Sequence, residues 1–389
     1  MDWPCALAPG RTDEHTHIDM LELDISTLER LRRIGLTPAL QETLETLSGE
    51  LAPDDTLCRV VEVQREGLAL HDGHTEWPAR LLPALRAELA GQNDALAVGD
   101  WVVASADVWQ GWWVRARIPP LNQLARRQHQ ERKHSDGRVT RTVIVSNVDT
   151  ALLVMGLDHD YNLRRLERYL ALVRMAGVRA AVVLTKADLC DEPGARLDAV
   201  RRMLPADVEA VGVNALDASA AQRLRPWLQP GHTLVLLGSS GAGKSTLTNL
   251  LAGDAIQETG GTRAGDGRGR HTTTARSLHA TPQGACIIDT PGLRTLRLDG
   301  DADALDDAFD DIARLALQCR FADCRHQAEP GCAVRDGVGS ERLRNYQKLQ
   351  REAERDSLSF LQRRARVSAW KARGREARMR METKRGGRP

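Results

Sequence analysis

Short apolar runs separated by turn residues occupy the chain between residues 57 and 118. Runs of this length with this punctuation are typical of β-strands. We expect strands at 58–64, 67–70, 77–81, 100–104 and 112–118. Five short strands in succession favour a small closed barrel of the OB type.

A different pattern runs from residue 143 to about residue 298, where strand-like and helix-like segments alternate. Strands are expected at 151–155, 180–184, 208–213, 233–237 and 285–288. Between the first two, apolar residues recur every three or four positions over 162–175, which predicts a helix. This alternation predicts an α/β nucleotide-binding domain, in which helices cover both faces of a parallel sheet.

The two ends of the chain have weaker patterns. Residues 1–50 carry ten Asp or Glu against four Arg, and Leu28, Leu31 and Ile34 share one face of an expected helix. We therefore expect a loose acidic extension with one docking helix. Helices are also expected at 306–317 and 340–360.

The net charge of +1 conceals an uneven distribution. Residues 361–389 contain eleven Lys or Arg against two Glu, a local charge of +9, so the other 360 residues sum to −8. Residues 121–141 are also basic, with six Lys or Arg against two acidic residues. We interpret 121–142 as a basic linker that is either simply solvated or touches phosphate groups beside the barrel.

The cysteines and the hydropathy pattern bear on the compartment. There are seven cysteines, an odd number, and three of them form one cluster, which fits a reducing cytosol better than a disulfide framework. No segment approaches the roughly 20 apolar residues of a membrane span. The first 20 residues are too polar for a signal peptide. We therefore expect a cytoplasmic protein with no membrane partner.

Five of the eight tryptophans lie in the predicted barrel, namely Trp77, Trp101, Trp109, Trp112 and Trp113. Such side chains either pack in the core of a barrel or stack on nucleic-acid bases. Neighbours on a strand face opposite ways, so one of the adjacent pair is expected to point outward.

The apolar run 233–237 leads into Gly-Ser-Ser-Gly-Ala-Gly-Lys-Ser at 238–245 and then into a helical stretch at 246–252. A strand, a glycine-rich turn and a helix in this order form a phosphate-binding loop, because small residues let successive backbone N–H groups point at phosphates. Lys244 is expected to reach the β- and γ-phosphates, and the Ser245 hydroxyl to ligate Mg²⁺.

Two tetrapeptides follow other predicted strands. In the first, 289–292, Asp289 can hold Mg²⁺ through water while the N–H of Gly292 faces the γ-phosphate. In the second, 185–188, the carboxylate of Asp188 can accept both N–H groups of a guanine edge, which adenine does not offer, and the stem of Lys186 can cover the base. Either tetrapeptide alone is also compatible with a plain exit from a strand into a loop.

Three thiols and one imidazole fall within fourteen residues, at Cys319, Cys324, His326 and Cys332. They meet the four-ligand tetrahedral requirement of zinc and leave no open position, so we expect a structural zinc site. The alternative is a chance group of buried thiols.

Together these motifs resemble those of a GTPase. Residues 185–188, 214–215, 238–245, 271–274 and 289–292 look like the fourth, fifth, first, second and third conserved GTPase elements, so the order is circularly permuted. A barrel, a permuted GTPase and a Cys/His cluster in this order resemble the RsgA (YjeQ/EngC) family of bacterial GTPases, over roughly residues 57–348.

The resemblance implies a GTP hydrolase that binds the small (30S) ribosomal subunit and its 16S rRNA, assists late maturation and leaves after hydrolysis, acting as a monomer. An alternative from another class is an rRNA-binding module that uses GTP only as a conformational latch. A weaker alternative is an ATP-using enzyme. The basic tail either stays solvated or binds rRNA phosphates, and we favour binding.

A glycine- and arginine-rich segment at 260–270 is the expected first switch, which orders around triphosphate and Mg²⁺. Thr273 is the expected metal ligand of the threonine run, and His271 either supplies a polar group to the reaction or is a bystander. Leu293 stands where Ras-like enzymes carry the water-positioning glutamine, so we expect slow intrinsic hydrolysis that a partner stimulates.

Two residues depart from the common GTPase pattern. Thr185 replaces an asparagine and can make only part of its contacts, which predicts weaker guanine selectivity. Asn214 stands where serine is usual, a milder change if the N–H of Ala215 reads the base.

The expected layout is an acidic extension (1–50), an OB-type barrel (51–120), a basic linker (121–142), a circularly permuted α/β GTPase domain (143–300), a mainly helical zinc-binding module (301–350) and a basic tail (351–389). The predicted nucleotide contacts are Thr185, Lys186, Ala187, Asp188, Asn214, Ala215, Gly238, Ser239, Ser240, Gly241, Ala242, Gly243, Lys244, Ser245 and Thr246. The predicted catalytic residues are His271, Thr273, Asp289 and Gly292. The predicted metal ligands are Ser245 and Thr273 for magnesium, and Cys319, Cys324, His326 and Cys332 for zinc.

Overall fold

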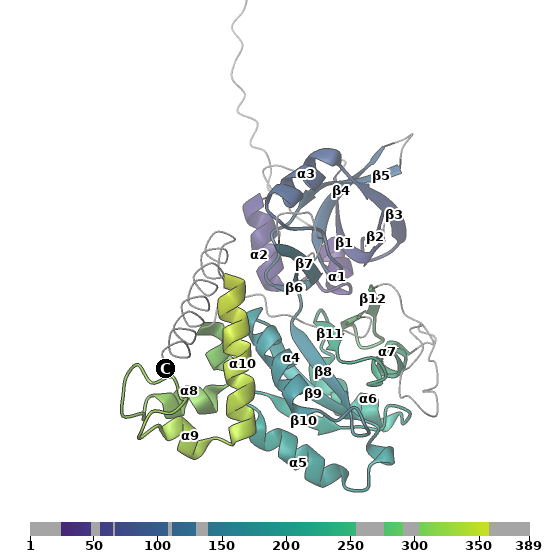
Figure 1. The fold of residues 1–389 in the computed structure, drawn as a ribbon. Coiled ribbons are helices and arrows are strands. Elements are labelled where there is room, and N and C mark those ends of the chain that lie inside the picture. Colours follow the sequence, from purple (N-terminus) through teal and green to yellow (C-terminus); the bar gives the residue numbers. More distant parts are fainter. Residues whose placement is uncertain are drawn as a thin grey trace, which may run out of the picture.

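The computed structural model describes residues 25–47, 55–64, 67–107, 111–129, 139–253, 276–290 and 303–357 of the chain. Figure 1 shows a barrel above an α/β domain, with a C-terminal helical module along one side of that domain. No helix in the described ranges is both long enough and apolar enough to cross a membrane.

The barrel is built from five strands and one helix: β1 (Thr56–Val63), β2 (Leu68–His71), β3 (Glu76–Leu81), α3 (Pro83–Gly91), β4 (Trp101–Asp107) and β5 (Gly111–Arg117). Strand β1 pairs with β2, β2 with β3, β3 with β5, β5 with β4, and β4 with β1, so the sheet closes on itself. Apolar side chains on alternate strand positions fill its interior. The predicted five-strand barrel is confirmed.

A helical hairpin precedes the barrel and packs on its outside. It consists of α1 (Ile25–Arg32) and α2 (Pro38–Leu47). Leu31, Ile34 and Leu40 share one apolar cluster with Trp101 and Ile118 of the barrel. The docking helix expected around Leu31 is present, but a second helix follows it where we had expected only a loose extension. Residues 1–24 lie outside the described ranges.

The expectation of a basic linker at 121–142 is wrong for the described residues of that segment. Strands β6 (Gln123–His129) and β7 (Val139–Ser146) form an antiparallel two-stranded ribbon there. Leu124 and Val145 are register partners in this ribbon and both are fully buried. The many Arg residues of this segment interrupt its apolar alternation, so the buried side of the ribbon leaves little trace in the sequence.

The α/β domain is a six-stranded sheet in the order β10 (Glu209–Gly212), β9 (Arg179–Thr185), β8 (Thr150–Gly156), β11 (Thr233–Leu237), β13 (Cys286–Asp289), β12 (Ser277–Ala280). The first five strands are parallel and correspond to the five predicted ones. Strand β12 was not predicted and runs antiparallel to β13. The helices are α4 (Leu163–Met175), α5 (Pro193–Met203), α6 (Ser219–Leu224) and α7 (Lys244–Ala252), with short 3₁₀ turns at Ala187–Leu189 and Arg225–Trp227.

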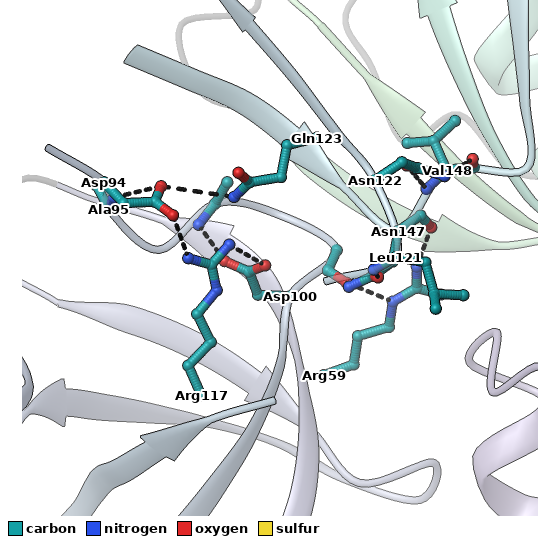
Figure 2. Close-up of polar contacts among 12 residues, drawn as sticks. Arg59, Asp94, Ala95, Asp100, Arg117, Leu121, Asn122, Gln123, Asn147 and Val148 are labelled. Atoms are coloured by element: carbon teal, nitrogen blue, oxygen red, sulfur yellow. Dashed lines mark hydrogen bonds and ion pairs between the residues drawn. The ribbon is translucent and has the colours of Figure 1, made fainter. Parts of the chain in front are cut away.

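Strand β12 also joins the two sheets. On its other edge it meets β1 of the barrel, where Ser277 is the register partner of Glu62. Close to this junction Arg59 is fully buried and donates to the carbonyls of Ile34, Gly99 and Asn147. Figure 2 shows Arg59 beside Asn147. The barrel is therefore joined to the α/β domain by the pairing of β1 with β12 and by the buried contacts of Arg59.

The C-terminal module contains a 3₁₀ turn (Asp303–Ala308), α8 (Asp310–Ala316), α9 (Ala333–Gly337) and α10 (Ser340–Ser357). The helix expected at 306–317 is divided at Phe309, whose backbone is not helical and whose buried ring meets Tyr346 edge-on at 5.3 Å between centroids. Helix α10 runs beside α4 (Figure 1). Of the expected helix 340–360, the last three residues lie outside the described ranges.

Candidate nucleotide site and Cys/His cluster

The carboxyl ends of the parallel strands place the predicted motifs along one edge of the sheet. Residues 238–245 follow β11, residues 185–188 follow or end β9, residues 214–215 come shortly after β10, and Asp289 ends β13. Ligands of open α/β sheets bind at this edge, outside the strand ends. The permuted order along the chain is thus compatible with one pocket in space.

The phosphate-binding loop is closed around its own lysine. The ammonium of Lys244 donates to the carbonyls of Gly238 at 3.1 Å and Ser239 at 2.8 Å. A Cβ at position 238 would lie 2.3 Å from the carbonyl oxygen of Val154, so the close approach of the loop to β8 requires glycine there. The loop therefore has a fixed cradle shape at the start of α7.

Lys244 is almost fully buried at 6% exposure. Burial lowers the pKa of its ammonium, while the carboxylates of Asp289 and Asp160 act in the opposite direction. Among the described residues, the ammonium of Lys244 is hydrogen-bonded only to neutral backbone carbonyls. It is well suited to bind phosphate oxygens, because a charge-assisted hydrogen bond to phosphate is stronger than a bond to a neutral carbonyl.

Asp289 and Ser245 face each other in this pocket. The Ser245 hydroxyl lies 3.5 Å from Oδ2 of Asp289, whereas Oδ1 is buried and has no hydrogen-bond partner among the described residues. Burial raises the pKa of Asp289, although Lys244, the N–H of Thr290 and Ser245 lower it. A buried carboxylate oxygen without a partner beside a serine hydroxyl fits an oxygen-coordinated divalent cation such as Mg²⁺.

The base-reading segment is tied directly to the phosphate-binding loop. The hydroxyl of Thr185 is fully buried and donates to the carbonyl of Ala242 at 2.6 Å. Gly243 leaves room for this contact, because a Cβ there would lie 3.2 Å from the same hydroxyl and the backbone has a φ of +92°. Thr185 therefore links the segment 185–188 to the glycine-rich loop 238–245 through its hydroxyl.

The remaining base-side residues lie around a short turn. Lys186 has a φ of +58° and precedes the 3₁₀ turn that carries Asp188, whose side chain is exposed. The Asn214 side chain accepts from the N–H of Leu216 at 3.0 Å, so it shapes its own loop. Ala215 is buried behind it.

Two carboxylates beside these segments belong to no recognised motif and were not predicted. Asp158 pairs with Lys186, and buried Asp160 accepts the Ser239 hydroxyl and pairs with Arg165 at 2.5 Å. Both follow β8, whose carboxyl end reaches the same sheet edge as the recognised motifs. That position was a usable signal, although no motif marks it.

Several predicted residues lie outside the described ranges. They are His271, Thr273, Gly292 and Leu293, together with the glycine-rich segment 260–270 and the tail 358–389. Their roles stay predictions.

The Cys/His cluster has the geometry of a tetrahedral metal site. The ligand atoms of Cys319, Cys324, His326 and Cys332 all lie within 4.8 Å of one another. The Cys332 sulfur is 3.4 Å from Nδ1 of His326 and 4.0 Å from the Cys319 sulfur. A tetrahedron with metal–sulfur bonds of about 2.3 Å has edges of about 3.8 Å. The cluster is therefore compatible with a four-coordinate zinc ion.

The described barrel tryptophans are buried or half-buried, and Trp77 and Trp112 pack against the barrel core. Trp101 is fully buried, while Trp77 and Trp112 are half-buried and stack with 4.6 Å between ring centroids. Trp113 is also half-buried, and Trp109 lies outside the described ranges.

Comparison with known proteins agrees with this geometry. Residues 122–299 match the family model described as RsgA GTPase. The chain is 43% identical over 311 residues to a small ribosomal subunit biogenesis GTPase RsgA of Xylella fastidiosa, an alignment that covers 77% of this chain and 87% of the relative. A protein of Vibrio vulnificus named small ribosomal subunit biogenesis GTPase RsgA 2 is 38% identical, with 87% of this chain and 92% of the relative covered.

Two solved structures share the fold. YjeQ from Thermotoga maritima has a TM-score of 0.55 at 22% identity and covers 77% of this chain and 98% of its own. YloQ, described as a circularly permuted GTPase, has a TM-score of 0.53 at 21% identity and covers 80% and 99%. With a permuted GTPase fold and relatives of this identity over most of its length, the chain belongs to the RsgA family of GTPases.

Proposed function

We propose that this protein hydrolyses GTP on the small (30S) ribosomal subunit, assists a late step of its maturation and leaves after hydrolysis. The observation that carries the proposal is the hydrogen bond from the Thr185 hydroxyl to the Ala242 carbonyl, which links the segment expected to read the base to the expected phosphate-binding loop. The relatives whose names describe small-subunit biogenesis supply the partner.

The roles of the pocket residues follow from their positions. The N–H groups of 238–245 and the ammonium of Lys244 would bind the phosphates, and the exposed carboxylate of Asp188 would select guanine. Ser245 and Asp289 would hold Mg²⁺, with Thr273 as a further ligand. The cation, when bound, neutralises charge on the phosphate oxygens. Gly292 and His271 complete the proposed catalytic set.

The zinc-binding module would meet the 16S rRNA. Beside the cluster is a groove of about 1120 Å³, lined by Arg325, Arg335, Arg344 and Arg351, and none of its described lining residues is acidic. All four of these arginines are exposed. One guanidinium group can bind two phosphate oxygens at once, so the arginines of the groove suit an RNA backbone. The stacked pair Trp77 and Trp112 and the basic tail would supply further RNA contacts. A structural zinc would hold the groove in shape.

The test is GTP turnover by the purified protein with and without purified 30S subunits. Turnover is expected to be slow alone and to rise at least about tenfold with 30S, while 50S subunits serve as the control particle. The Lys244→Ala variant is expected to lose both rates, which ties them to this pocket. GTP binding without any stimulation would instead support a conformational latch.

Base selection is tested separately. Because Thr185 points at the phosphate-binding loop, guanine selection would depend on Asp188. In calorimetric competition, GTP is expected to displace ATP completely, and Asp188→Asn to reduce the preference for GTP by about tenfold or more. Equal affinity of the wild-type protein for both nucleotides would favour the ATP-using alternative.

A further inference from the structure

A third loop lies between the two recognised nucleotide-binding segments. It comprises residues 156–162, between β8 and α4, and it contacts both of them. On one side the N–H of Leu157 donates to the carbonyl of Thr185 at 2.9 Å. On the other side the carboxylate of Asp160 accepts the hydroxyl of Ser239 in the phosphate-binding loop. The loop is thus part of the wall of the pocket.

Asp158 reaches the base-reading segment from this loop. Its Oδ2 lies 2.7 Å from the ammonium of Lys186, and the two side chains are only 15% and 20% exposed. Burial alone would raise the pKa of Asp158, but the hydrogen bond from Lys186 and the N–H of Asp160 outweigh it and hold the pKa below its ordinary value. The carboxylate is therefore ionised and bonded to Lys186 at neutral pH.

The loop holds Asp158 in place. A Cβ on Gly156 would lie 2.5 Å from Oδ1 of Asp158, and the same carboxylate oxygen accepts the N–H of Asp160 at 3.0 Å. The carbonyl of Asp158 accepts the N–H of Tyr161 at 3.1 Å. The side chain of Asp158 is thus held in place by its own loop. Its position therefore determines where the ammonium of Lys186 lies.

Lys186 needs such an anchor because of its backbone. At a φ of +58° it occupies the left-handed region, which costs a residue with a side chain about 1 kcal/mol. That conformation starts the turn that carries Asp188. The ion pair with Asp158 holds the far end of the Lys186 side chain, and the turn that carries Asp188 starts at Lys186.

We propose that Asp158 is a positioning residue for guanine recognition, which acts through Lys186 by holding its stem and the Asp188 turn in the orientation that receives the base. The proposal builds on the nucleotide site proposed above. Asp160 plays the corresponding part at the phosphate end, through Ser239. The loop therefore contacts both segments, in addition to the direct bond between Thr185 and Ala242.

The test is a double-mutant cycle with Asp158→Ala, Lys186→Met and the double variant, in the full-length protein. Affinities for GDP and ADP are measured by competition against a fluorescent GDP analogue. Asp158→Ala is expected to weaken GDP about tenfold and ADP less than about twofold, because adenine makes no pair with Asp188. In the Lys186→Met background, Asp158→Ala is expected to change GDP affinity less than twofold further.

Two further variants guard against loss of fold. Asp158→Asn keeps the shape of the side chain, removes its charge, and is expected to show most of the loss of GDP affinity. Asp191→Ala removes a charge from an exposed position after the same turn and is expected to bind GDP like the wild-type protein.

Equal losses of GDP and ADP affinity in Asp158→Ala, or additive effects of the two substitutions, would show a general structural role and overturn the proposal. An unchanged GDP affinity in Asp158→Ala would overturn it too, while leaving the nucleotide site intact. If the wild-type protein binds no guanine nucleotide, the proposed function itself fails and this inference fails with it.

Discussion

The α/β domain is joined to its two neighbours by different chemistry. At the barrel, Arg59 is fully buried and donates to three backbone carbonyls. At the C-terminal module, Arg168 and Arg342 pair with carboxylates across the partly exposed seam between α4 and α10. Salt and water screen pairs at such a seam but not a contact in the interior. We infer that the barrel is fixed at this contact, whereas the C-terminal module combines salt-sensitive ion pairs with an apolar cluster in which Phe309, Ile312 and Leu349 pack with the α/β core.

The barrel junction is also braced on either side of Arg59. Arg117 pairs with Asp94 and Asp100, both at 2.9 Å, and the amide of Asn147 donates to the carbonyl of Gly99 at 3.0 Å (Figure 2). Burial raises the pKa of Asp100, against the effect of Arg117 and the N–H of Ala97. The contact of Asn147 connects the barrel to the segment that leads into β8, whereas the two pairs of Arg117 lie within the barrel.

Removal of the proposed zinc is the strongest test of this difference, because it should affect one neighbour only. Structural zinc supplies about 10–16 kcal/mol of apparent binding free energy in small zinc domains. A chelator, or Cys332→Ser, is therefore expected to abolish protection against hydrogen exchange in α8, α9 and α10. The barrel and GDP affinity should be unaffected. Loss of protection in β1 to β5 as well would show that the two neighbours are coupled.

Arg59→Met is the largest expected change at the barrel junction. The substitution fills the space but leaves buried carbonyls without their donor, and we expect the free energy of unfolding to fall by about 3–5 kcal/mol. Urea denaturation followed by tryptophan fluorescence measures it. Arg80→Met, at an exposed position on β3, is the matched control and should stay within about 0.5 kcal/mol. A loss at Arg59 no larger than at Arg80 would contradict the inference of a fixed barrel.

A smaller effect is expected for Arg342→Met. Arg342 bonds both oxygens of Asp311 at 2.9 and 2.8 Å, pairs with Glu167 and covers the ring of Phe309. We expect α10 to open more readily by about 2 kcal/mol, with the gap to wild type shrinking at high salt. Hydrogen exchange at two salt concentrations measures this, and Arg351→Met on the opposite side of α10 is the control. Amide hydrogen exchange of the backbone around Arg59 should be the same at both salt concentrations.

The smallest effect is on titration at the same seam. Burial alone would raise the pKa of Asp311, but Arg342 outweighs burial and holds the pKa below its ordinary 3.8. At Glu167 burial prevails over Arg342 and the pKa is raised. Arg342→Met is expected to raise both pKa values, as followed by carboxyl-carbon NMR.

The consequences for stability have opposite signs. Asp311 stabilises the fold above its ordinary pKa, and this stabilisation is lost as pH falls through its lowered folded pKa. Glu167 favours the fold below its ordinary pKa, and this is lost as pH rises through its raised folded pKa. Without Arg342, the stabilisation that Asp311 contributes at neutral pH should shrink, and the destabilisation that Glu167 causes at neutral pH should grow. Unchanged titration of both groups would mean that Arg342 is not their partner in solution.

Much of this molecule could be predicted from sequence because its signals are local. Alternating apolar runs gave the barrel strands, and the strand-glycine-helix order located Lys244 beside Gly238. The spacing of Cys319 to Cys332 likewise lies within one loop, so the cluster followed from the sequence alone.

The contacts that escaped prediction are non-local. Arg59 bonds to residues 25, 40 and 88 positions away, and nothing in its strand distinguishes it from a surface arginine. Asp158 meets Lys186 only because β8 and β9 are neighbours in the sheet. Strand β12 has four residues and too short an alternation to recognise.

The position of β12 has a consequence for handling the protein. Its inner edge pairs with β13 and its outer edge meets β1, so the barrel acts as a cover for the last strand of the α/β sheet. An uncovered strand edge presents free N–H and C=O groups on which another chain can add. A truncated protein that lacks the barrel would keep every nucleotide-binding motif but leave the outer edge of β12 unpaired. If it aggregates more readily than the full-length protein, the barrel protects this edge.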